Sequence, residues 1–533
     1  YIDRASVDLY SFYAQGGYFA DNTSVKFITF GGKEKTYHAW NYATKEEMKK
    51  YGRRFNSCGM YTDDDGHIRF YKDQTDNYLQ MNYQLLLNHT FSAAWNLNAA
   101  LHYTKGDGYY QEYKEDRSLK EYRLHPFMYD GKEVEKSDLI RQKKMDNHFG
   151  GGVFSVNYRN EKLDASLGGA LNYYDGWHFG RVIWVKNYIG ELLPDHEYYR
   201  NKAKKTDGNL YLKANYNLVA GLNAYADLQY RYINYKIHGD NDKYDYNTDG
   251  LQKLAVNDHF NFFNPKAGLN WDIDSNNRVY ASFSVAQKEP TRNNYTDGNA
   301  DEYPKAEKLY DYELGYTYRN TWLSAGVNFY YMDYKDQLVL TGELNEIGEA
   351  MARNVPDSYR TGVELMLGVK PCRWFQWDIN GTLSKNRVKN FTEKLYEDEW
   401  KNPIEVEHGN TPIAFSPDFI LNNRFSFSHK GFEAALQSQY VSKQYMSNAK
   451  QAEQTLDAYF VSNLNLAYTF QLRHVKSVTV GFTIYNLFNE KYENNGYAGS
   501  GYTLKDGKPE RYNYAGYAAQ AGTNVMGNLS IRF

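Results

Sequence analysis

The chain has 533 residues, of which 62 are basic and 65 acidic, so its formal net charge is −3 and no basic excess indicates a nucleic-acid partner. Tyrosine is the unusual component, with 54 residues, while proline is scarce at 11. No stretch of about 18 apolar residues occurs, which excludes a membrane-spanning helix. A hydrophilic, aromatic-rich chain fits either a large soluble β-protein, such as a propeller, or a transmembrane β-barrel whose strands show apolar side chains only at every second residue.

The chain begins with residues that already alternate as a strand does. The opening sequence YIDRASVDLYSF predicts a first strand over residues 5–17. It contains no signal peptide and does not start with Met, so we expect the true N-terminus to be missing.

The alternation recurs in 19 strand candidates along the chain. Within residues 222–232, Leu228 and Tyr230 share one face with other apolar residues, and the residues between them are mostly polar. A sandwich would alternate as well, with its apolar face inward, so the period alone leaves sandwich and barrel open. In a barrel the polar set lines the lumen, and its candidate members are Asp227, Arg231, Gln376, Asp378, Glu433, Gln437, Asn463 and Asn465.

The connections between strands favour the barrel. Short and long connections alternate without exception, as they do in outer-membrane barrels with short periplasmic turns and long extracellular loops. A propeller would instead repeat in blades of about 40 residues, and we find no such repeat. The predicted short turns are near 18–21, 92–94, 160–161, 219–220, 274–277, 320–321, 369–374, 430–431 and 471–475. The predicted long loops are near 36–76, 113–146, 179–206, 239–260, 289–308, 336–356, 389–417, 445–457 and 488–522.

Aromatic residues cluster where strands approach the long loops. Amphipathic rings prefer the level of the lipid headgroups, so these clusters predict an aromatic girdle, although aromatics are also good strand formers in general. The predicted strands are roughly 11–16 residues long, more than the 9–11 that a tilted spanning strand needs. We therefore expect them to project beyond the bilayer on the loop side. The clusters are Tyr109 and Tyr110, Tyr173, Tyr174 and Trp177, Tyr230 and Tyr232, and Phe329, Tyr330 and Tyr331.

Parity bears on how complete the barrel is. Single-chain bacterial barrels have an even number of strands with both ends on the periplasmic side, and 19 is odd. Because the first strand precedes a short turn, we expect three further strands before residue 1, giving 22, the size of plugged transporters.

Several stretches resemble one family, the TonB-dependent outer-membrane receptors. The segment IYNLFNEKY, with a final strand ending in Phe533, resembles their C-terminal signature; its named positions are Asn486, Leu487, Phe488, Tyr492 and Phe533. Residues 310–338 resemble their paired mid-barrel strands, and residues 354–367 resemble the strand after the next loop. Residues 174–184 and 264–271 are similar to a branch common in Bacteroidetes, the iron-complex receptors.

The resemblance covers nearly the whole chain and implies an architecture and a function. It implies that residues 1–533 are the β-barrel domain, that an N-terminal plug fills the barrel, and that TonB pulls on the plug to release a scarce ligand inward. From the resemblance we expect the plug, the TonB box and about three strands to be missing from this sequence. The implied partners are outer-membrane lipid, TonB acting through the plug, and a ferric siderophore or similar complex, with a surface lipoprotein as a further candidate.

No catalytic constellation or resident cofactor is predicted. The segment GGKEKT lacks the spacing of a phosphate-binding loop. The acidic segments at 62–67 and 240–250 are solvated loops in the simpler interpretation and Ca²⁺ sites in the alternative, and the second has Tyr244 where an EF-hand would need an oxygen ligand.

The nature of the ligand is left open by the sequence. The resemblance associates haem uptake with a histidine in the loop at 287–309, which has none, although His38, His67 and His178 lie on or beside other loops. Tyrosine-rich loops suit flat ligands such as catecholates, and equally sugars and cobalamin. Loop cations could attract an anionic ferric complex, for instance Arg53, Arg54, Arg292 and Arg353.

We therefore expect energy-coupled uptake of an iron complex. Cobalamin or glycan uptake by the same fold and a passive porin or adhesin are the alternatives.

The two cysteines are expected to be free thiols. Cys58 falls on a predicted extracellular loop and Cys372 in a predicted periplasmic turn, so about 30 Å of barrel should separate them.

Overall fold

The computed structural model describes residues 1–189, 192, 196–246, 248–297, 303–345, 349–397 and 401–533. Parts of five predicted loops, at 179–206, 239–260, 289–308, 336–356 and 389–417, fall outside these residues. The helical elements are α1 (Lys45–Tyr51), α2 (Arg292–Thr296) and a 3₁₀ turn (Leu119–Tyr122). The strands are β1 (Val7–Phe19), β2 (Thr23–Tyr37), β3 (Met60–Thr62), β4 (Ile68–Phe70), β5 (Thr75–Thr90), β6 (Trp95–Ser118), β7 (Phe127–Tyr129), β8 (Lys132–Val134), β9 (Lys136–Arg159), β10 (Leu163–Val185), β11 (Glu197–Val219), β12 (Leu222–Asp245), β13 (Gly250–Asp272), β14 (Asn277–Lys288), β15 (Glu307–Arg319), β16 (Leu323–Leu344), β17 (Ala350–Cys372), β18 (Phe375–Glu397), β19 (Lys401–Pro412), β20 (Phe419–His429), β21 (Phe432–Val441), β22 (Gln444–Tyr445), β23 (Thr455–Leu456), β24 (Tyr459–Leu472), β25 (Val475–Tyr485), β26 (Glu493–Lys505), β27 (Lys508–Ala519) and β28 (Asn524–Arg532).

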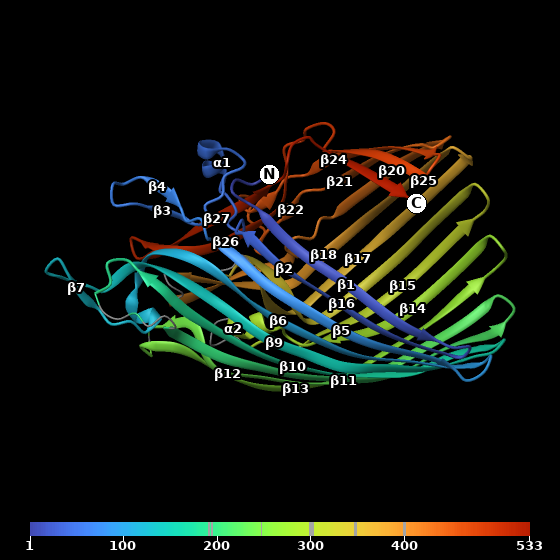
Figure 1. Ribbon diagram of the computed structural model, residues 1–533, viewed down its shortest axis with the longest axis horizontal. Coiled ribbons are helices and arrows are strands. Elements are labelled where there is room, and N and C mark those ends of the chain that lie inside the picture. The colour runs from blue at the N-terminus through green and yellow to red at the C-terminus, as the bar shows by residue number, and fades with distance from the viewer. Residues whose placement is uncertain (190–191, 193–195, 247, 298–302, 346–348, 398–400) are drawn as a thin grey trace.

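One antiparallel sheet dominates the molecule and curls into a barrel (Figure 1). Its neighbours follow chain order from β1 to β28, with the small strands in the loops left out. β18 pairs with β19 along its loop-side half and with β20 along its turn-side half, so these two strands occupy one position. The 20 strands of the sheet therefore fill 19 positions, as predicted. The prediction of an antiparallel β-barrel is confirmed.

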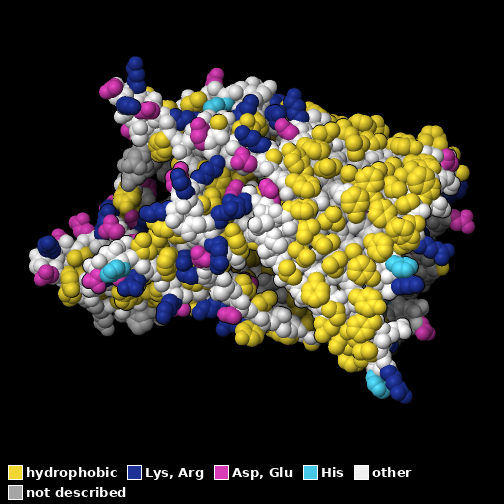
Figure 2. Space-filling model, turned by 90° about the horizontal axis from the view of Figure 1, so that it is seen from above, with side chains coloured by type: hydrophobic (Ala, Val, Ile, Leu, Met, Phe, Trp, Pro, Cys, Tyr) yellow, Lys and Arg dark blue, Asp and Glu magenta, His cyan; other side chains and the backbone are white. Residues whose placement is uncertain are grey.

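The outer face of the barrel is apolar on its turn-side half (Figure 2). Along each strand, every second side chain points outward, and many of these are large and exposed; Leu101 and Leu171, for example, each keep 62% of their surface accessible. Exposed leucine and aromatic rows on a folded sheet are unfavourable in water but suit hydrocarbon. Charged side chains gather instead over the loop-side half.

Several of the short turns are held by the same kind of side-chain contact. One side-chain oxygen accepts hydrogen bonds from the two backbone N–H groups that follow the bend, as Asn320 does for Trp322 and Leu323 at 3.0 and 2.8 Å. Asn160 and Asp274 act in the same way in their turns. Asparagine and aspartate are suited to turns because their short side chains can bond to nearby backbone. Each of the nine predicted turns overlaps a junction between two consecutive strands, although some, such as 369–374, also include strand residues.

The strands are longer than predicted. β6, β9 and β12 have 24 residues each, against the 11–16 expected, and several predicted loops therefore begin inside strands. The prediction ended each strand where the apolar alternation faded. The backbone ladder does not depend on an outward apolar face, so the same strands continue toward the loops. There the apolar side chains move to the inner face, as Ile233, Tyr235 and Ile237 of β12 do, and are buried.

The long loops contain structure of their own. The largest addition is the hairpin β26–β27, inside the predicted loop 488–522, and it lies close to β16 and β18. Its turn is Asp506–Gly507, with φ of 51° and 73°, which is the pairing typical of a two-residue hairpin turn. The hairpin could therefore have been predicted from this dipeptide in the sequence. No helix among the described residues is long and apolar enough to cross a membrane.

The two edge strands of the sheet each have one partner among the described strands. β1 pairs with β2, and β28 pairs with β25. At the loop end, the segment 38–74 nevertheless contacts the segment 486–523: Ala43 and Tyr517 form a backbone bridge, and Arg53 forms an ion pair with Glu493. We call this contact the rim tie. The total of 22 strands stays a prediction.

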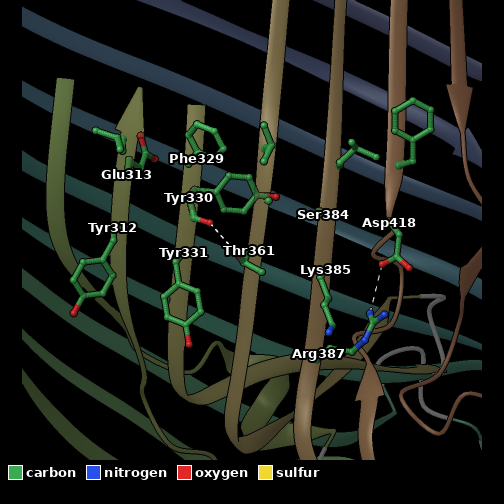
Figure 3. Close-up of a pocket in the computed structure, with 15 residues that line it drawn as sticks. Tyr312, Glu313, Phe329, Tyr330, Tyr331, Thr361, Ser384, Lys385, Arg387 and Asp418 are labelled. Atoms are coloured by element: carbon green, nitrogen blue, oxygen red, sulfur yellow. Dashed lines mark hydrogen bonds and ion pairs between the residues drawn. The ribbon is translucent and has the colours of Figure 1, made fainter. Parts of the chain in front are cut away.

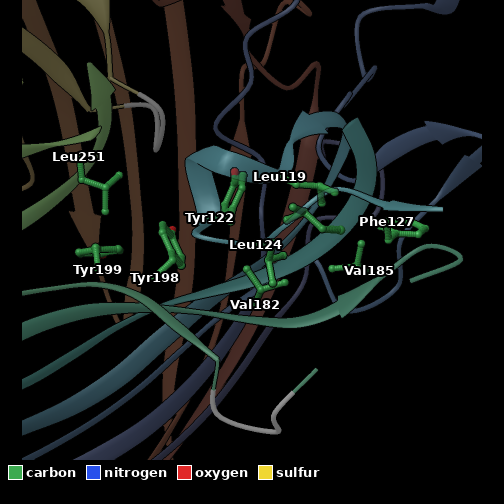
Figure 4. Close-up of a cluster of buried hydrophobic side chains, with 10 residues drawn as sticks. Leu119, Tyr122, Leu124, Phe127, Val182, Val185, Tyr198, Tyr199 and Leu251 are labelled. Atoms are coloured by element: carbon green, nitrogen blue, oxygen red, sulfur yellow. The ribbon is translucent and has the colours of Figure 1, made fainter. Parts of the chain in front are cut away.

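A buried apolar cluster supports the loops near β9–β11 (Figure 4). The 3₁₀ turn places Leu119 and Tyr122 over β10 and β11, against Val182 and Tyr198. Beneath it, Arg141 forms an ion pair with Glu112 at 2.9 Å, and both are almost fully buried. Burying two charges together is tolerated because each satisfies the other, and here Arg141 also donates to the Tyr122 hydroxyl at 3.3 Å.

The two cysteines are free thiols at opposite ends of the barrel, as predicted. Cys58 is 1% exposed, and burial raises the pKa of its thiol to about 11, whereas Cys372 is partly accessible. Because the thiolate is the reactive form, Cys58 should be inert at neutral pH.

We expect a maleimide at pH 7.5 to label the folded protein once, at Cys372. The Cys372→Ser variant should remain unlabelled until denaturant is added, and intact-protein mass would measure both. The Cys58→Ser variant is the control and should still take one label. Rapid labelling of folded Cys372→Ser would contradict the burial of Cys58.

Candidate functional site

The predicted lumen residues lie on the face of the sheet opposite the exposed apolar rows. Asp227 and Arg231 on β12 alternate with Leu228 and Tyr230, whose side chains are exposed outward. Asp227 has one carboxylate oxygen, Oδ1, that is buried without a hydrogen-bond partner. Their part in lining a transport passage stays a prediction.

Arg231 is the centre of an ion-pair network on this face. Its guanidinium donates to Asp207 at 3.0 and 2.6 Å and to Glu289 at 3.0 and 3.1 Å. Lys205 pairs with the same Glu289 carboxylate. The sequence reasoning missed Asp207, Glu289 and Lys205. The signal for Asp207 and Lys205 was their position in the polar set of β11, but only the register with β12 brings them beside Arg231.

The other predicted lumen residues are amides and carboxylates on β18, β21 and β24. Gln376 donates to the Asp378 carboxylate at 2.9 Å. Asn465 accepts from Thr483 at 2.9 Å, and Asn463 accepts from the backbone N–H of Asn486 at 2.9 Å. Gln437 lies opposite Asn463 in the register, and Glu433 is exposed beside the turn that precedes β21.

Three carboxylates on β15 and β17 form an acidic group on the same face. They are Asp311, Glu313 and Glu364, and the described residues include no ion pair to any of them. Asn328 on β16 lies among them, donates to Glu364 at 3.3 Å and is 6% exposed, with its Oδ1 unpartnered. Like charges held together in this way favour a cationic partner.

The loop-side end of the polar face carries a second group, which we call the anion site. Arg292 on α2 donates through Nη2 to Asn201 at 2.7 Å, while its buried Nη1 has no partner among the described residues. His178 on β10 has a buried, unpartnered Nε2 and lies within electrostatic reach of Arg292 and Lys143. Tyr174, Tyr199 and Tyr235 surround these groups. Buried donors without acceptors are costly, so an anion there would stabilise the site.

The other loop arginines named from the sequence already have partners. Arg53 pairs with Glu493, Arg54 with Asp3 at 3.0 Å, and Arg353 with Glu343 at 3.9 Å. Arg292 differs from them in having an amide partner and a buried Nη1 without a partner among the described residues, and its role in attracting an anion stays a prediction.

The candidate Ca²⁺ segments differ in geometry. Asp63, Asp65 and His67 bring potential ligand atoms within 4.8 Å of one another, but Asp63 already pairs with Arg69 at 2.8 Å and bonds two backbone N–H groups. In the second segment, Asp240 pairs with Arg123 and Lys253, and residue 247 lies outside the described residues. Ca²⁺ binding stays untested at both.

The histidines considered for haem are held apart. His38 is 3% exposed and stacks on Trp40 with 3.6 Å between ring centroids, and burial lowers its pKa to about 4. His67 is exposed on its loop. Of the stretch 287–309, residues 298–302 lie outside the described residues.

The C-terminal signature residues have structural contacts. Asn486, with φ of 48°, donates through its amide to the carbonyls of Glu490 and Ala521 at 2.8 and 2.9 Å and accepts from the Glu490 N–H at 2.8 Å. Leu487 bonds to β24 through its backbone N–H, and Tyr492 stacks on Tyr459 at 4.5 Å. Phe488 and Phe533 are exposed. Asn486 thus fastens both ends of the segment 486–523.

The family to which the chain belongs agrees with the barrel fold. Residues 11–487 match the family model described as TonB dependent receptor-like, beta-barrel. The chain belongs to the TonB-dependent receptors, as the resemblance predicted, and the β-barrels of this family are outer-membrane proteins.

Individual relatives are distant. A pesticin receptor of Yersinia enterocolitica is 24% identical over 225 residues, which cover 41% of this chain and 30% of that protein. Among solved structures, the ferric-catecholate import receptor Fiu of E. coli K12 has a TM-score of 0.65 at 10% identity, covering 100% of this chain and 75% of that one. The ferric yersiniabactin uptake receptor FyuA of Yersinia pestis has 0.65 at 14%, with 99% and 71% covered. The siderophore receptor PiuA of Acinetobacter baumannii has 0.68 at 11%, with 100% and 75% covered. At these identities the likeness shows the fold.

Loss of the Asn486 side chain should loosen the segment 486–523. We expect Asn486→Ala to speed tryptic cleavage at the Lys505–Arg511 tip about tenfold, because three hydrogen bonds are lost and the left-handed backbone disfavours alanine. The matched control is Asn494→Ala, whose side chain accepts one bond from Gln520. Equal cleavage rates in the two variants would contradict the fastening role.

Proposed function

We propose that this chain is the barrel of a receptor that takes up an iron complex across the outer membrane with energy supplied through TonB. The observation that carries the proposal is the anion site at the loop end of the polar face. There Arg292 Nη1 and His178 Nε2 are buried without a hydrogen-bond partner among the described residues, and the two side chains lie within electrostatic reach of each other. Ferric complexes of catecholates and carboxylates are commonly anionic, and a guanidinium recognises such oxygen-rich surfaces well.

The tyrosines around the anion site extend the argument to the shape of the ligand. Tyr199 and Tyr235 are nearly buried and lie beside the cations. Aromatic rings stack on flat ligand faces, and their hydroxyls can bond to ligand oxygens. The names of the structural neighbours, which include ferric-catecholate and ferric yersiniabactin receptors, support an iron complex of this chemical kind.

The experiment that tests this function is growth under iron limitation. Deleting the gene should slow the uptake of radiolabelled iron presented as a ferric siderophore, and the protein should become more abundant in outer-membrane fractions of starved cells. Unchanged uptake and unchanged abundance would overturn the iron assignment while leaving the barrel intact.

A single substitution tests the anion site directly. We expect Arg292→Ala to raise the Kd for a ferric catecholate or ferric yersiniabactin roughly tenfold, because one charge-assisted contact is lost. Quenching of intrinsic fluorescence in detergent would measure the Kd. Arg54→Ala removes an exposed loop arginine that pairs with Asp3 and is the control. Equal affinities of both variants and the parent would show that the ligand binds elsewhere.

The acidic group supports a further part of the proposal, that a basic surface occupies the barrel interior. Asp311, Glu313 and Glu364 lie together without a cation from the described residues, and a plug carrying basic side chains would satisfy them. This interpretation rests on the plug implied by the family.

Removing these charges should loosen a plug. In the full-length receptor, we expect Glu313→Gln combined with Glu364→Gln to raise passive leakage, measured as conductance in planar bilayers or as sensitivity of cells to large antibiotics. Asp378→Asn, on β18 and bonded to Gln376, is the matched control. A double variant as tight as the parent would contradict the plug contact.

A further inference from the structure

The outer face of the barrel carries a groove at the border between its apolar and charged halves. It has a volume of about 860 Å³ and crosses strands β15 to β18 and the start of β20 (Figure 3). Its outward-facing lining consists mainly of Tyr312, Leu314, Phe329, Val363, Leu383 and Phe419. Glu313 of the acidic group also belongs to the lining, with Tyr330 and Ser384, but these residues alternate along their strands with the outward ones.

The strand register arranges the surroundings of the groove in rows. One apolar row runs across five strands and consists of Leu314, Phe329, Val363, Leu383 and Phe419. The next row toward the loops is Tyr312, Tyr331, Thr361 and Lys385, and the row after that is Tyr310, Asp333, Tyr359 and Arg387. The change from hydrocarbon to aromatic and then to charged side chains is the order expected through a lipid interface.

The shape of the groove follows from side-chain size. Val363 and Thr361 on β17 are small, and they lie between the large residues Phe329 and Tyr331 on one side and Leu383 and Lys385 on the other. The small side chains on β17 therefore form the floor of the groove, and its apolar lining suits an acyl chain.

The loop-side end of the groove is positively charged. Lys385 has no ion-pair or hydrogen-bond partner within the described part of the chain. Arg387 donates to the Asn386 carbonyl at 2.8 Å and lies 3.5 Å from Asp418, whose side chain is 60% exposed. By contrast, Lys389 nearby pairs with Asp333 at 3.4 Å and Lys335 with Asp357. The positive charge that has no carboxylate partner among the described residues is therefore that of Lys385, beside the groove.

The height of these cations fits a headgroup. Lys385 is ten residues above Phe375, the first residue of β18 at the turn end. At about 3.3 Å per residue and a strand tilt of about 40°, this distance is roughly 25 Å, the height of the apolar band of an outer-membrane barrel.

We propose that the groove is a binding site for a phosphate-bearing lipid, lipopolysaccharide, of the leaflet on the loop side. An acyl chain lies along Val363 and Leu383, and a phosphate is bound by Lys385 and Arg387. The tyrosine hydroxyls of Tyr312 and Tyr331 point toward the same end (Figure 3) and face the headgroup region. The inference rests on the proposed outer-membrane location.

Site-specific photocrosslinking in growing cells tests the proposal. The full-length protein carries Tyr331→p-benzoylphenylalanine at the groove, and the captured lipid is identified by gel mobility and mass spectrometry. We expect lipopolysaccharide to be captured, and Lys385→Ala combined with Arg387→Ala to lower the yield about fivefold or more. Lys236→Ala, an exposed lysine on the outward face of β12 away from the groove, is the matched control and should leave the yield within about twofold.

Two further variants separate the possible failures. Lys385→Glu reverses one charge and should lower the crosslinking yield of lipopolysaccharide. It serves as the test if the double variant folds poorly. The heat-dependent gel shift of the barrel measures the folding of each variant. Leu212→p-benzoylphenylalanine, in the middle of the apolar belt, reports general lipid contact. Two outcomes would overturn the lipopolysaccharide site while lipid is still captured at Leu212. One is the capture of phospholipid alone at Tyr331, and the other is a crosslinking yield at Tyr331 that does not change when Lys385 and Arg387 are substituted. No lipid at either position would overturn the membrane location and the site together.

Discussion

The antiparallel hydrogen-bond ladder is the constraint on which the rest of this structure depends. A strand that crosses hydrocarbon must satisfy each backbone N–H and C=O through its neighbours, and a curled sheet does this while sending alternate side chains to two different solvents. The outward rows of leucine and the inward ion pairs of Arg231 are two results of the same geometry. Register then decides which residues meet, because a shift of one residue would exchange the two faces.

The ladder also explains how much could be predicted. Alternation and the strict sequence of short and long connections were enough for the antiparallel barrel and its 19 strand positions. Strand ends were not, because β6 and β12 continue beyond the outward apolar rows. On β12 the apolar alternation changes face there, with Ile233, Tyr235 and Ile237 buried inside. The hairpin β26–β27 was not predicted, although the dipeptide Asp506–Gly507 is a typical sequence signal for a two-residue hairpin turn.

The candidate site was less accessible to sequence reasoning. Arg231 was recognised as a polar-face residue, but its partners Asp207 and Glu289 lie 24 and 58 residues away and meet it only through the fold. Four loop arginines were indistinguishable by sequence. In the structure three of them pair with carboxylates, whereas Arg292 bonds to the amide of Asn201 and its buried Nη1 has no acceptor among the described residues. The signature residue Asn486 illustrates the opposite case, since a recognisable motif turned out to make structural contacts with both ends of a long loop.

The rim tie has a consequence for the order of assembly. Arg53 and Glu493 are 440 residues apart, so their contact closes one of the longest loops the chain can make. The entropic cost of so remote a contact is met only when the intervening strands already hold the two segments close together. The loop after β2 can therefore reach its final contacts only after the hairpin β26–β27 has formed. The loop end of the barrel is thus among the last parts to fold, and the rim tie forms only when the whole sheet is in place.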